Sequence, residues 1–450
     1  MRKLTNWEKV GYGFGDVGNS VTFTMTAMFL LMFYTDVLKI PPVAAGVLFF
    51  IARIWDAFAD TVMGAFIDRR GQKSPAGKFR PFLIKGSWPV LVLAVLVFVA
   101  PEWDTSWKIV WAYATYIAWG TAYSFINIPY GSLASVMTDD QRDRAALSVT
   151  RSVGGALGGL LPQMVVVPIV LMFANPKTGW VVAMASMAVV AFVGYVISYK
   201  TSVEQIQHNP KEKKATLKEI LMMIKTNRPF WGVSVGSIAI IVTWMLNGAM
   251  AIYYFKFNLH AEVLYGIKGF IGMIPVLVLS PILALLVSKY GNRKLAIWGS
   301  VFTSLSYLII FVLPDNIYIY FAFFFLGSVA LSFPNMLTWM MIADCVEYAE
   351  WKSGKRQEAI VYAAYSFMRK ISQAFSGLLA GIGLSLIGYQ AGATQQSAHT
   401  LFGIKFFAAG IPFIGMIVAM LAFLFIYNLT PKFYKQIILD LEKRRERQEQ

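Results

Sequence analysis

Two carboxylates stand one helical turn apart inside an apolar stretch of the chain. Asp56 and Asp60 are spaced i and i+4, so on a helix they share one face. Two carboxylates with little water around them repel each other, which favours the protonated form of at least one. Such a pair can hold a proton or give oxygen ligands to a small cation such as sodium. The spacing predicts a cation-coupling site, with a structural ion pair to Arg53 as the alternative.

Two cations follow each other inside another apolar stretch. Arg369 and Lys370 lie in the middle of a segment long enough to cross a bilayer, where charges are costly and call for anionic partners. The nearest unclaimed carboxylates are Asp56 and Asp60. We therefore expect Lys370 to face inward and bridge to them, and Arg369 to extend toward an interface.

Aromatic and hydrogen-bonding side chains gather in the stretch near 108–134. They are Tyr116, Trp119, Tyr123, Ser124, Asn127, Pro129, Tyr130 and Ser132. A sugar has apolar faces that stack on rings and hydroxyls that need hydrogen-bonding partners, so these residue types suit one. Four further residues can add to such a site: Asp16, Asn19, Ser20 and Trp339. The set favours a polar neutral or anionic organic solute over a bare ion.

The composition says what must hold these residues in place. Of the 450 residues, 57% are hydrophobic and 14% are charged, whereas soluble domains average about 45–50% and about 25%. Such a chain needs lipid as its solvent, which excludes a cytosolic enzyme, a disulfide scaffold and a disordered protein. With Cys345 as the single cysteine and three scattered histidines, we expect no metal cluster, no cofactor and no enzymatic activity.

Twelve apolar stretches are long enough to span a bilayer as helices, which takes about 20 residues each. This predicts an all-α polytopic membrane protein. The spans lie near 11–35, 43–67, 82–100, 108–134, 150–173, 179–199, 230–255, 262–287, 295–313, 317–342, 360–388 and 403–428.

The basic residues predict the orientation of these spans. With both termini and the even-numbered loops on one side, that side holds 31 of the 40 Lys and Arg residues. Basic residues collect in cytoplasmic loops, so we expect both termini in the cytoplasm. The net charge of +16 then has a membrane explanation, and no nucleic-acid partner is expected.

The chain repeats itself. The stretch around Asp68 and Arg69 in 64–71 matches 284–294 at an offset of 220 residues, and Pro129 with Asp139 matches Pro334 with Asp344 at an offset of 205. Repeated halves suit a transporter that rocks about a central site. We expect Asp68, Arg69 and Asp344 to take part in that conformational change.

The repeat predicts two pseudo-symmetric six-helix halves and sets the expected domain bounds. The halves are residues 1–199 and 230–428, joined by a cytoplasmic loop at 200–229 and followed by a cytoplasmic tail at 429–450.

Short motifs along the whole chain resemble the glycoside–pentoside–hexuronide:cation symporters, a branch of the major facilitator superfamily. They are Tyr34-Thr35-Asp36, Arg53-Ile-Trp-Asp56-x-x-x-Asp60, Gly77-Lys78-Phe79-Arg80-Pro81, Asn127-Ile-Pro-Tyr-Gly, Arg142-Asp-Arg144, Ala343-Asp344-x-x-Glu347-Tyr348 and Lys370. The Asn127 motif and Arg369-Lys370-x-x-Gln373-Ala look most like bacterial glucuronide carriers, with pentoside carriers as close competitors.

The resemblance implies site residues by similarity to the melibiose permease of that family. Asp56 and Asp60 match its cation-site carboxylates, and Ser124 matches a hydroxyl ligand near the cation. The sugar-site matches are Tyr123, Arg151 and Lys370.

The sequence also departs from the melibiose permease pattern. Ser20 and Asn127 stand where the melibiose permease has acidic sugar-binding residues, Gly131 where it has a tryptophan, and Ala59 where it has a cation-site asparagine. Galactoside specificity is therefore not carried over.

The resulting expectation is a monomer in a bacterial inner membrane. We expect it to import a sugar glycoside, a glucuronide or a pentoside, by alternating access. We expect protons to drive this, because Ala59 supplies no side-chain oxygen to a sodium ion; sodium and lithium stay open. A lipid or lysolipid carrier of related fold is the alternative, although the polar stretch near 108–134 argues against an apolar cleft.

Overall fold

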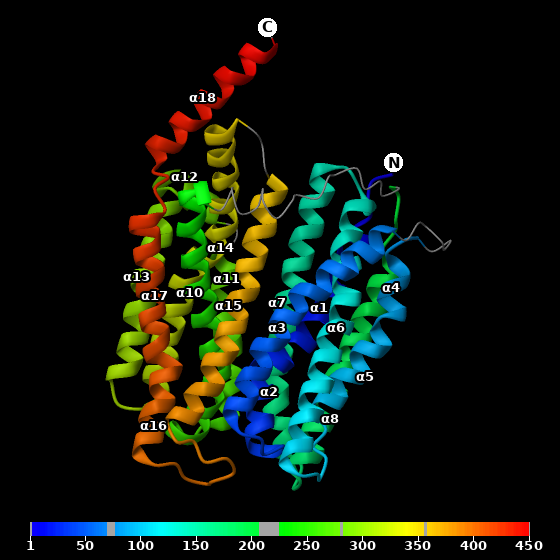
Figure 1. The fold of residues 1–450 in the computed structure, drawn as a ribbon, viewed down its shortest axis with the longest axis vertical. Helices are drawn as coiled ribbons and strands as arrows, with labels where there is room; N and C mark the ends of the chain where they lie inside the picture. Colours follow the sequence, from blue (N-terminus) through cyan, green and yellow to red (C-terminus); the bar gives the residue numbers. More distant parts are fainter. Residues whose placement is uncertain (1, 70–76, 207–224, 280–281, 355–357, 450) are drawn as a thin grey trace. The chain divides into compact units, whose positions relative to one another are not determined.

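The computed structural model describes residues 2–69, 77–206, 225–279, 282–354 and 358–449, and these residues form helices joined by short loops (Figure 1). The chain divides into two compact units, each described here by itself. Unit 1 contains Met1–Lys211, Ala251–Phe270 and Gly377–Thr400. Unit 2 contains Glu212–Met250, Ile271–Ser376 and Leu401–Gln450.

The first six predicted spans correspond to helices of unit 1. In chain order they are α1 (Asn6–Thr24) continued by η1 (Met25–Phe29), α2 (Leu30–Met32) and η2 (Phe33–Val37); α3 (Pro42–Arg69); α4 (Arg80–Lys85) with α5 (Ser87–Val97); α6 (Thr105–Met137); α7 (Gln141–Leu171); and α8 (Pro176–Thr201).

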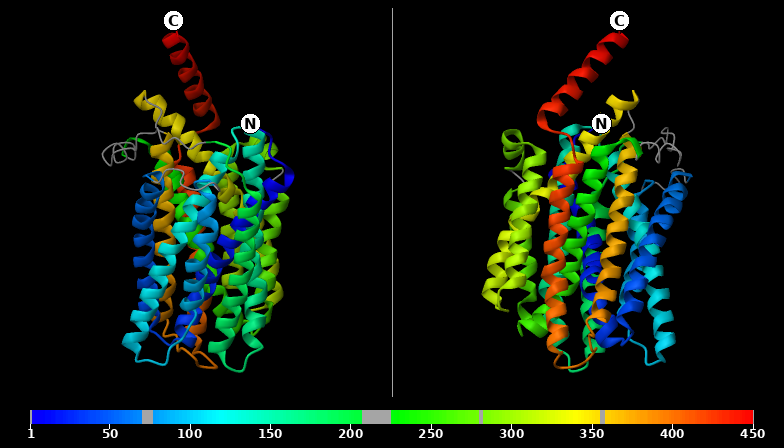
Figure 2. Two further views of the ribbon diagram at one scale, coloured as in Figure 1. Left: turned by 90° about the vertical axis from the view of Figure 1, so that its right-hand side faces the viewer. Right: turned by 60° about the vertical axis from the view of Figure 1, so that its left-hand side comes forward.

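The other six predicted spans correspond to later helices. They are α10 (Arg228–Tyr253) with η3 (Tyr254–Asn258); η4 (Glu262–Leu264) with α11 (Tyr265–Leu279) and α12 (Leu283–Tyr290); α13 (Asn292–Val312); α14 (Ile317–Ser353); α15 (Glu358–Leu386); and α16 (Ala398–Lys405) with η5 (Phe406–Gly410), α17 (Ile411–Leu421) and η6 (Ala422–Ile426). A last helix, α18 (Pro431–Glu449), follows; in Figure 2 it is red and extends past the end of α17 in unit 2.

Nine of the helical stretches in the described ranges are long and apolar enough to cross a membrane. Three of the twelve predicted spans are not among these nine. One of them contains α11, which has only 15 described residues. The remaining two are α6, which carries the polar and aromatic residues noted above, and α15, which carries Arg369 and Lys370. The other predicted site residues lie on α1, α3, α7 and α14, which are all among the nine.

Side-chain caps begin several of these helices. Before α1, Thr5 and Glu8 form a reciprocal capping box, in which the Thr5 amide donates to Glu8 Oε2 at 2.8 Å. Asp140, Asn175 and Asn316 accept backbone amide hydrogens at the starts of α7, α8 and α14. Each such cap stabilises a helix by about 1 kcal/mol.

Several helices extend beyond the predicted span limits. α7 begins at Gln141 where the sequence suggested about 150, and α14 continues to Ser353 where it suggested 342. Asp344, which follows the predicted span end at 342, therefore lies inside α14. A helix does not stop at the edge of the bilayer when capping and packing beyond that edge continue to stabilise it.

Small residues let the helices of unit 1 pack closely. α1 packs against α7 and α8, and α3 packs against α6; Figure 1 shows these helices side by side. At the α1–α7 crossing, a Cβ added to Gly154 would lie 2.1 Å from the Gly13 carbonyl oxygen. Only glycine permits that approach, which brings residues of the predicted sugar site on the two helices together.

Candidate functional site

The carboxylate Asp56 is held in an ion pair on α3. Arg53 Nη1 donates to Asp56 Oδ2 at 3.0 Å, and the two side chains are only 10% and 14% exposed. Arg53 Nη2 also donates to the Tyr116 hydroxyl at 3.4 Å, and its guanidinium lies 5.3 Å from the centre of the Phe23 ring. The ion pair foreseen as an alternative is therefore present, and it fixes Asp56 in the interior of unit 1.

Gly120 on α6 makes room for this carboxylate. A Cβ added to Gly120 would lie 2.5 Å from Asp56 Oδ1, so any other residue would push the carboxylate aside. In the contacts between α3 and α6, a higher residue number on one helix goes with a higher residue number on the other. Tyr113 donates to the Ala44 carbonyl at 3.2 Å, Arg53 meets Tyr116, and Asp56 meets Gly120. The two helices are therefore parallel.

This register bears on the other predicted cation ligands. Asp60 is one turn beyond Asp56, and Ser124 is one turn beyond Gly120. Parallel helices in this register bring Asp60 and Ser124 to the same level, with Ser124 buried and Asp60 half-buried. The cation-coupling role of Asp56, Asp60 and Ser124 stays a prediction that this arrangement supports.

The predicted sugar-site residues of unit 1 form one polar cluster. Arg151 Nε on α7 donates to Asp16 Oδ2 on α1 at 2.8 Å, and the guanidinium lies 5.2 Å from the centre of the Tyr130 ring. Asn19 Nδ2 donates to Asp16 Oδ1 at 3.3 Å and to Asn127 Oδ1 at 3.4 Å. Residues from α1, α6 and α7 are thereby joined.

Ser20 and Tyr123 lie on the same helices as this cluster. A Cβ added to Gly155 on α7 would lie 3.5 Å from Ser20 Oγ. The Tyr123 ring belongs to a row of rings on α6, with its centre 5.4 Å from that of Trp119. Aromatic rings beside carboxylate, amide and guanidinium groups suit a sugar, which has apolar faces and polar hydroxyls.

The remaining sugar-site candidates belong to unit 2. The Arg369 guanidinium lies 5.2 Å from the centre of the Trp339 ring and 5.9 Å from that of Tyr365. Tyr365 in turn shares a hydrogen bond of 2.9 Å with Ser237. Trp339 is 46% exposed and Lys370 is half-buried. A bridge from Lys370 to Asp56 and Asp60 would join the two units and stays a prediction.

The predicted gating residues are only partly described. Asp344 Oδ2 accepts hydrogen bonds from Asn292 Nδ2 at 3.2 Å and from the Tyr427 hydroxyl at 2.9 Å, which ties α14 to the start of α13 and to the residue after η6. Asp68 and Arg69 belong to the last turn of α3, but their side chains lie outside the described residues.

A charged cluster around Asp36 was not foreseen as a site. Lys256 Nζ donates to Asp36 Oδ2 at 3.1 Å, and the Tyr389 hydroxyl donates to Asp36 Oδ1 at 2.6 Å. Thr35 shares a hydrogen bond of 2.9 Å with the Tyr253 hydroxyl. In the sequence Asp36 was only part of a family motif, and nothing in it identified partners 220 and 353 residues away.

Among the described residues, no three His, Cys, Asp or Glu side chains come together as metal ligands. The described clusters consist of ion pairs, carboxylates and hydrogen-bonding groups beside aromatic rings. That combination suits recognition of a polar solute and of a proton or small cation.

Comparisons with known proteins agree with this reading. The family model described as MFS/sugar transport protein matches residues 11–431. An uncharacterized symporter of Bacillus subtilis, YjmB, is 37% identical over 98% of this chain and 96% of its own length. The glucuronide carrier protein homolog of Escherichia coli is 29% identical, over 100% and 98%.

A solved structure shows the same fold. The crystal structure of a bacterial homologue of the human lysosomal transporter Spinster aligns with a TM-score of 0.71, over 97% of this chain and 99% of that one, at 12% identity. The fold class and the resemblance expected from the sequence are confirmed: the chain belongs to the major facilitator superfamily of membrane transporters, in its sugar transport family.

Proposed function

We propose that this sugar transporter is a proton-coupled symporter of a glycoside, either a glucuronide or a pentoside. It works as a monomer by alternating access in a bacterial inner membrane, with both termini in the cytoplasm. The basic residues of the termini and even-numbered loops support this orientation. The repeated halves support alternation about a central site.

The observation that carries the coupling proposal is the position of Asp56. It is a carboxylate in an apolar span that pairs with Arg53 at 3.0 Å and lies so close to Gly120 that no Cβ fits between them. Asp60 follows one turn later on the same face. The Arg53 guanidinium favours the charged form of Asp56, and a second negative charge one turn away then favours uptake of a proton by Asp60. Proton binding and release there would change the charge that the surrounding helices must accommodate.

Ala59, which directly precedes Asp60 in the sequence, bears on the choice of coupling ion. Ala59 is 7% exposed and has no side-chain oxygen, so Asp56, Asp60 and Ser124 are the side chains available to a sodium ion. Sodium needs several oxygen ligands in a closed shell, whereas a proton needs one carboxylate. The residues therefore favour protons over sodium, with lithium as a weak substitute.

The polar cluster on α1, α6 and α7 supports an anionic cargo. The Arg151 side chain is 39% exposed and donates through Nε to Asp16, while a guanidinium has five N–H donors in all. Its remaining donors can meet a sugar carboxylate, and the uncharged Ser20 and Asn127 would not repel one. The name of the glucuronide carrier homolog points the same way.

Counterflow in proteoliposomes tests the cargo. The purified protein is reconstituted, loaded with unlabelled sugar, and exchanged against labelled glucuronides, xylosides and galactosides. We expect exchange with a glucuronide or a xyloside and little with a galactoside. Absence of exchange with every glycoside, together with thermal stabilisation by lysolipids, would favour the lipid carrier instead.

A further inference from the structure

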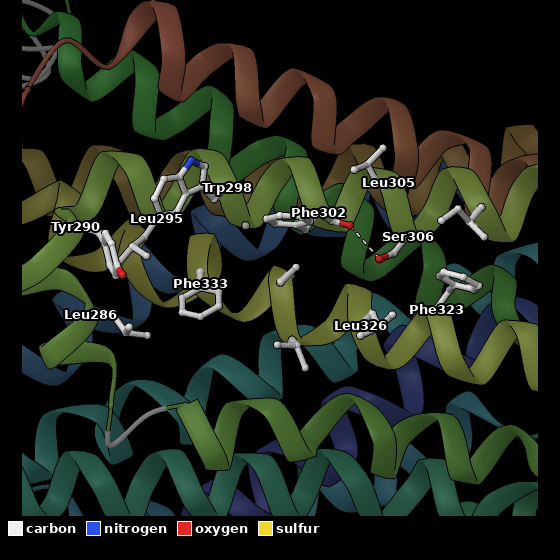
Figure 3. Close-up of a pocket in the computed structure, with 14 residues that line it drawn as sticks. Leu286, Tyr290, Leu295, Trp298, Phe302, Leu305, Ser306, Phe323, Leu326 and Phe333 are labelled. Atoms are coloured by element: carbon white, nitrogen blue, oxygen red, sulfur yellow. Dashed lines mark hydrogen bonds between the residues drawn. The ribbon is translucent and has the colours of Figure 1, made fainter.

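An apolar groove runs along the helices of unit 2, and none of its lining residues is a site residue named above. It has a volume of about 570 Å³, which lies in the range of cavities that hold whole small ligands. Figure 3 shows the side chains around it. Its lining is Leu286, Tyr290, Leu295, Trp298, Gly299, Phe302, Leu305, Ser306, Ile309, Phe323, Leu326, Val329, Ala330 and Phe333.

These side chains leave little for a polar ligand to bind. No lining residue is charged, and the hydroxyl groups come from Tyr290 and Ser306. Ser306 Oγ already donates to the Phe302 carbonyl at 2.9 Å (Figure 3). A sugar would lose its hydrogen bonds to water here without replacing them. The groove therefore suits a hydrocarbon chain.

One end of the groove is basic. Leu286, Tyr290, Leu295 and Trp298 gather at that end, and Phe323 with Ser306 at the other (Figure 3). Lys289 Nζ lies 5.2 Å from the centre of the Tyr290 ring, and Lys294 directly precedes Leu295. Both lysines are exposed.

The neighbouring arginine is committed elsewhere. Arg293 donates to the carbonyls of Phe423 and Leu424 at 3.1 and 2.5 Å. Lys289 and Lys294 are exposed cations at this end of the groove.

The dimensions fit a lipid. From Leu295 to Ile309, α13 rises about 21 Å at 1.5 Å per residue, comparable with a long, extended acyl chain. The groove begins at a basic loop, where a lipid headgroup would lie, and runs from there along membrane-spanning helices. Each lysine near an anionic membrane surface adds about 1 kcal/mol of attraction.

We propose that this groove binds one acyl chain of an anionic phospholipid, whose phosphate lies beside Lys289 and Lys294. The lipid holds α12, α13 and α14 together from the bilayer side. This proposal rests on membrane insertion alone and not on the cargo or the coupling ion. A failure of the transport proposal leaves it standing.

Thermal unfolding of the full-length protein in detergent tests it. The probes are phosphatidylglycerol, phosphatidylcholine with the same acyl chains, and glycerol phosphate as a headgroup without a chain. We expect phosphatidylglycerol to raise the unfolding midpoint most, phosphatidylcholine less, and glycerol phosphate not at all. Equal effects of the two lipids, or an effect of glycerol phosphate alone, would refute the proposal.

Paired variants separate the two parts of the site. Lys289→Gln with Lys294→Gln should weaken phosphatidylglycerol binding about 10- to 30-fold, to the level of phosphatidylcholine. The matched control is Lys435→Gln with Lys443→Gln, two exposed lysines of α18, which should leave binding unchanged. An equal loss in the control pair would show unspecific charge attraction and overturn the site.

Val329→Trp tests the groove itself. Val329 is half-buried in the lining, so an indole there fills the space and should remove the effect of both lipids. Retained stabilisation by phosphatidylglycerol would contradict the proposal. So would a parent protein that is a dimer and that Val329→Trp converts to a monomer, because the groove would then bind a second copy of the chain. The lysine pair lies on the surface, so it decides the matter even where Val329→Trp folds poorly.

Discussion

Asp56 and Asp60 carry the coupling proposal at the scale of single residues. Asp60→Asn should abolish uphill accumulation in proteoliposomes, because an amide cannot bind and release a proton, while counterflow exchange survives. Asp56→Asn should do the same. The exposed Asp104 is the matched control, and Asp104→Asn should accumulate cargo normally. Full accumulation by both site variants would show that coupling lies elsewhere.

Asp56→Asn has a second expected effect, which the ion pair explains. It leaves Arg53, only 10% exposed, without its carboxylate, and breaking a buried pair costs about 3–5 kcal/mol. We therefore expect a lowered unfolding midpoint for Asp56→Asn, and recovery of part of it in Arg53→Gln with Asp56→Asn. This difference separates loss of coupling from loss of folded protein.

Ala59 offers a constructive test of ion choice. Ala59→Asn adds an amide oxygen next to Asp60 and one turn from Asp56, and should introduce or strengthen sodium-stimulated uptake. The measurement is initial uptake at fixed pH as sodium replaces potassium, with the unsubstituted protein as control. Unchanged sodium dependence in the variant would mean that side-chain oxygens at this position do not set the choice of ion.

Gly120 tests whether the position of the Asp56 carboxylate matters. Gly120→Ala places a Cβ 2.5 Å from Asp56 Oδ1, and overpacking of this kind costs about 1–3 kcal/mol. Proton-driven uptake should fall more than the unfolding midpoint alone explains, because the carboxylate is displaced from its position beside Arg53. Gly159→Ala is the control, because its Cβ would lie an ordinary 3.5 Å from Thr24 Oγ1. Equal loss in both variants would point to general helix packing.

At the scale of elements, the Asp36 cluster ties three segments of unit 1 together. Its carboxylate is 9% exposed and receives Lys256 and Tyr389. Hydrogen bonds to charged groups contribute about 1.5–3 kcal/mol each. Asp36→Asn should therefore lower the unfolding midpoint and slow uptake. Lys256→Gln should have the same effects to a slightly smaller extent.

The control for this cluster is a surface ion pair. Lys177 donates to Glu102 at 2.8 Å, with Glu102 86% exposed, and exposed pairs contribute about 0–1 kcal/mol. Lys177→Gln should leave the midpoint within a degree or so of the parent protein. If Asp36→Asn is as mild as Lys177→Gln, the Asp36 cluster does not hold these segments together.

The sequence predicted what is encoded locally. The shared face of Asp56 and Asp60 follows from helical spacing, and their pairing with Arg53 was foreseen as an alternative because it is one turn away. The spans follow from runs of apolar residues. The start of α7 and the end of α14 were not predicted. Capping and packing prolong these helices past the apolar residues, and the hydrophobicity of the sequence does not mark where the helices end.

Contacts between distant segments could not be predicted in this way. Asp16 and Arg151 are 135 residues apart, and Asp36 and Tyr389 are 353 apart. Asp16, Arg151 and Asp36 belong to the predicted site or to a family motif, whereas Tyr389 belongs to neither, and no local pattern says which loops or helices meet. The space that Gly120 leaves for the Asp56 carboxylate could not be predicted either, because a glycine in an apolar span can occur for several structural reasons.

At the scale of the whole molecule, the central claim is that a proton gradient drives a glycoside across the membrane. The most direct measurement is uptake into proteoliposomes of the glycoside that exchanges best in counterflow, with a pH gradient imposed at fixed sodium. The account predicts accumulation above equilibrium that a protonophore abolishes and that a sodium gradient does not restore. Accumulation driven by a sodium gradient and indifferent to the protonophore would contradict it.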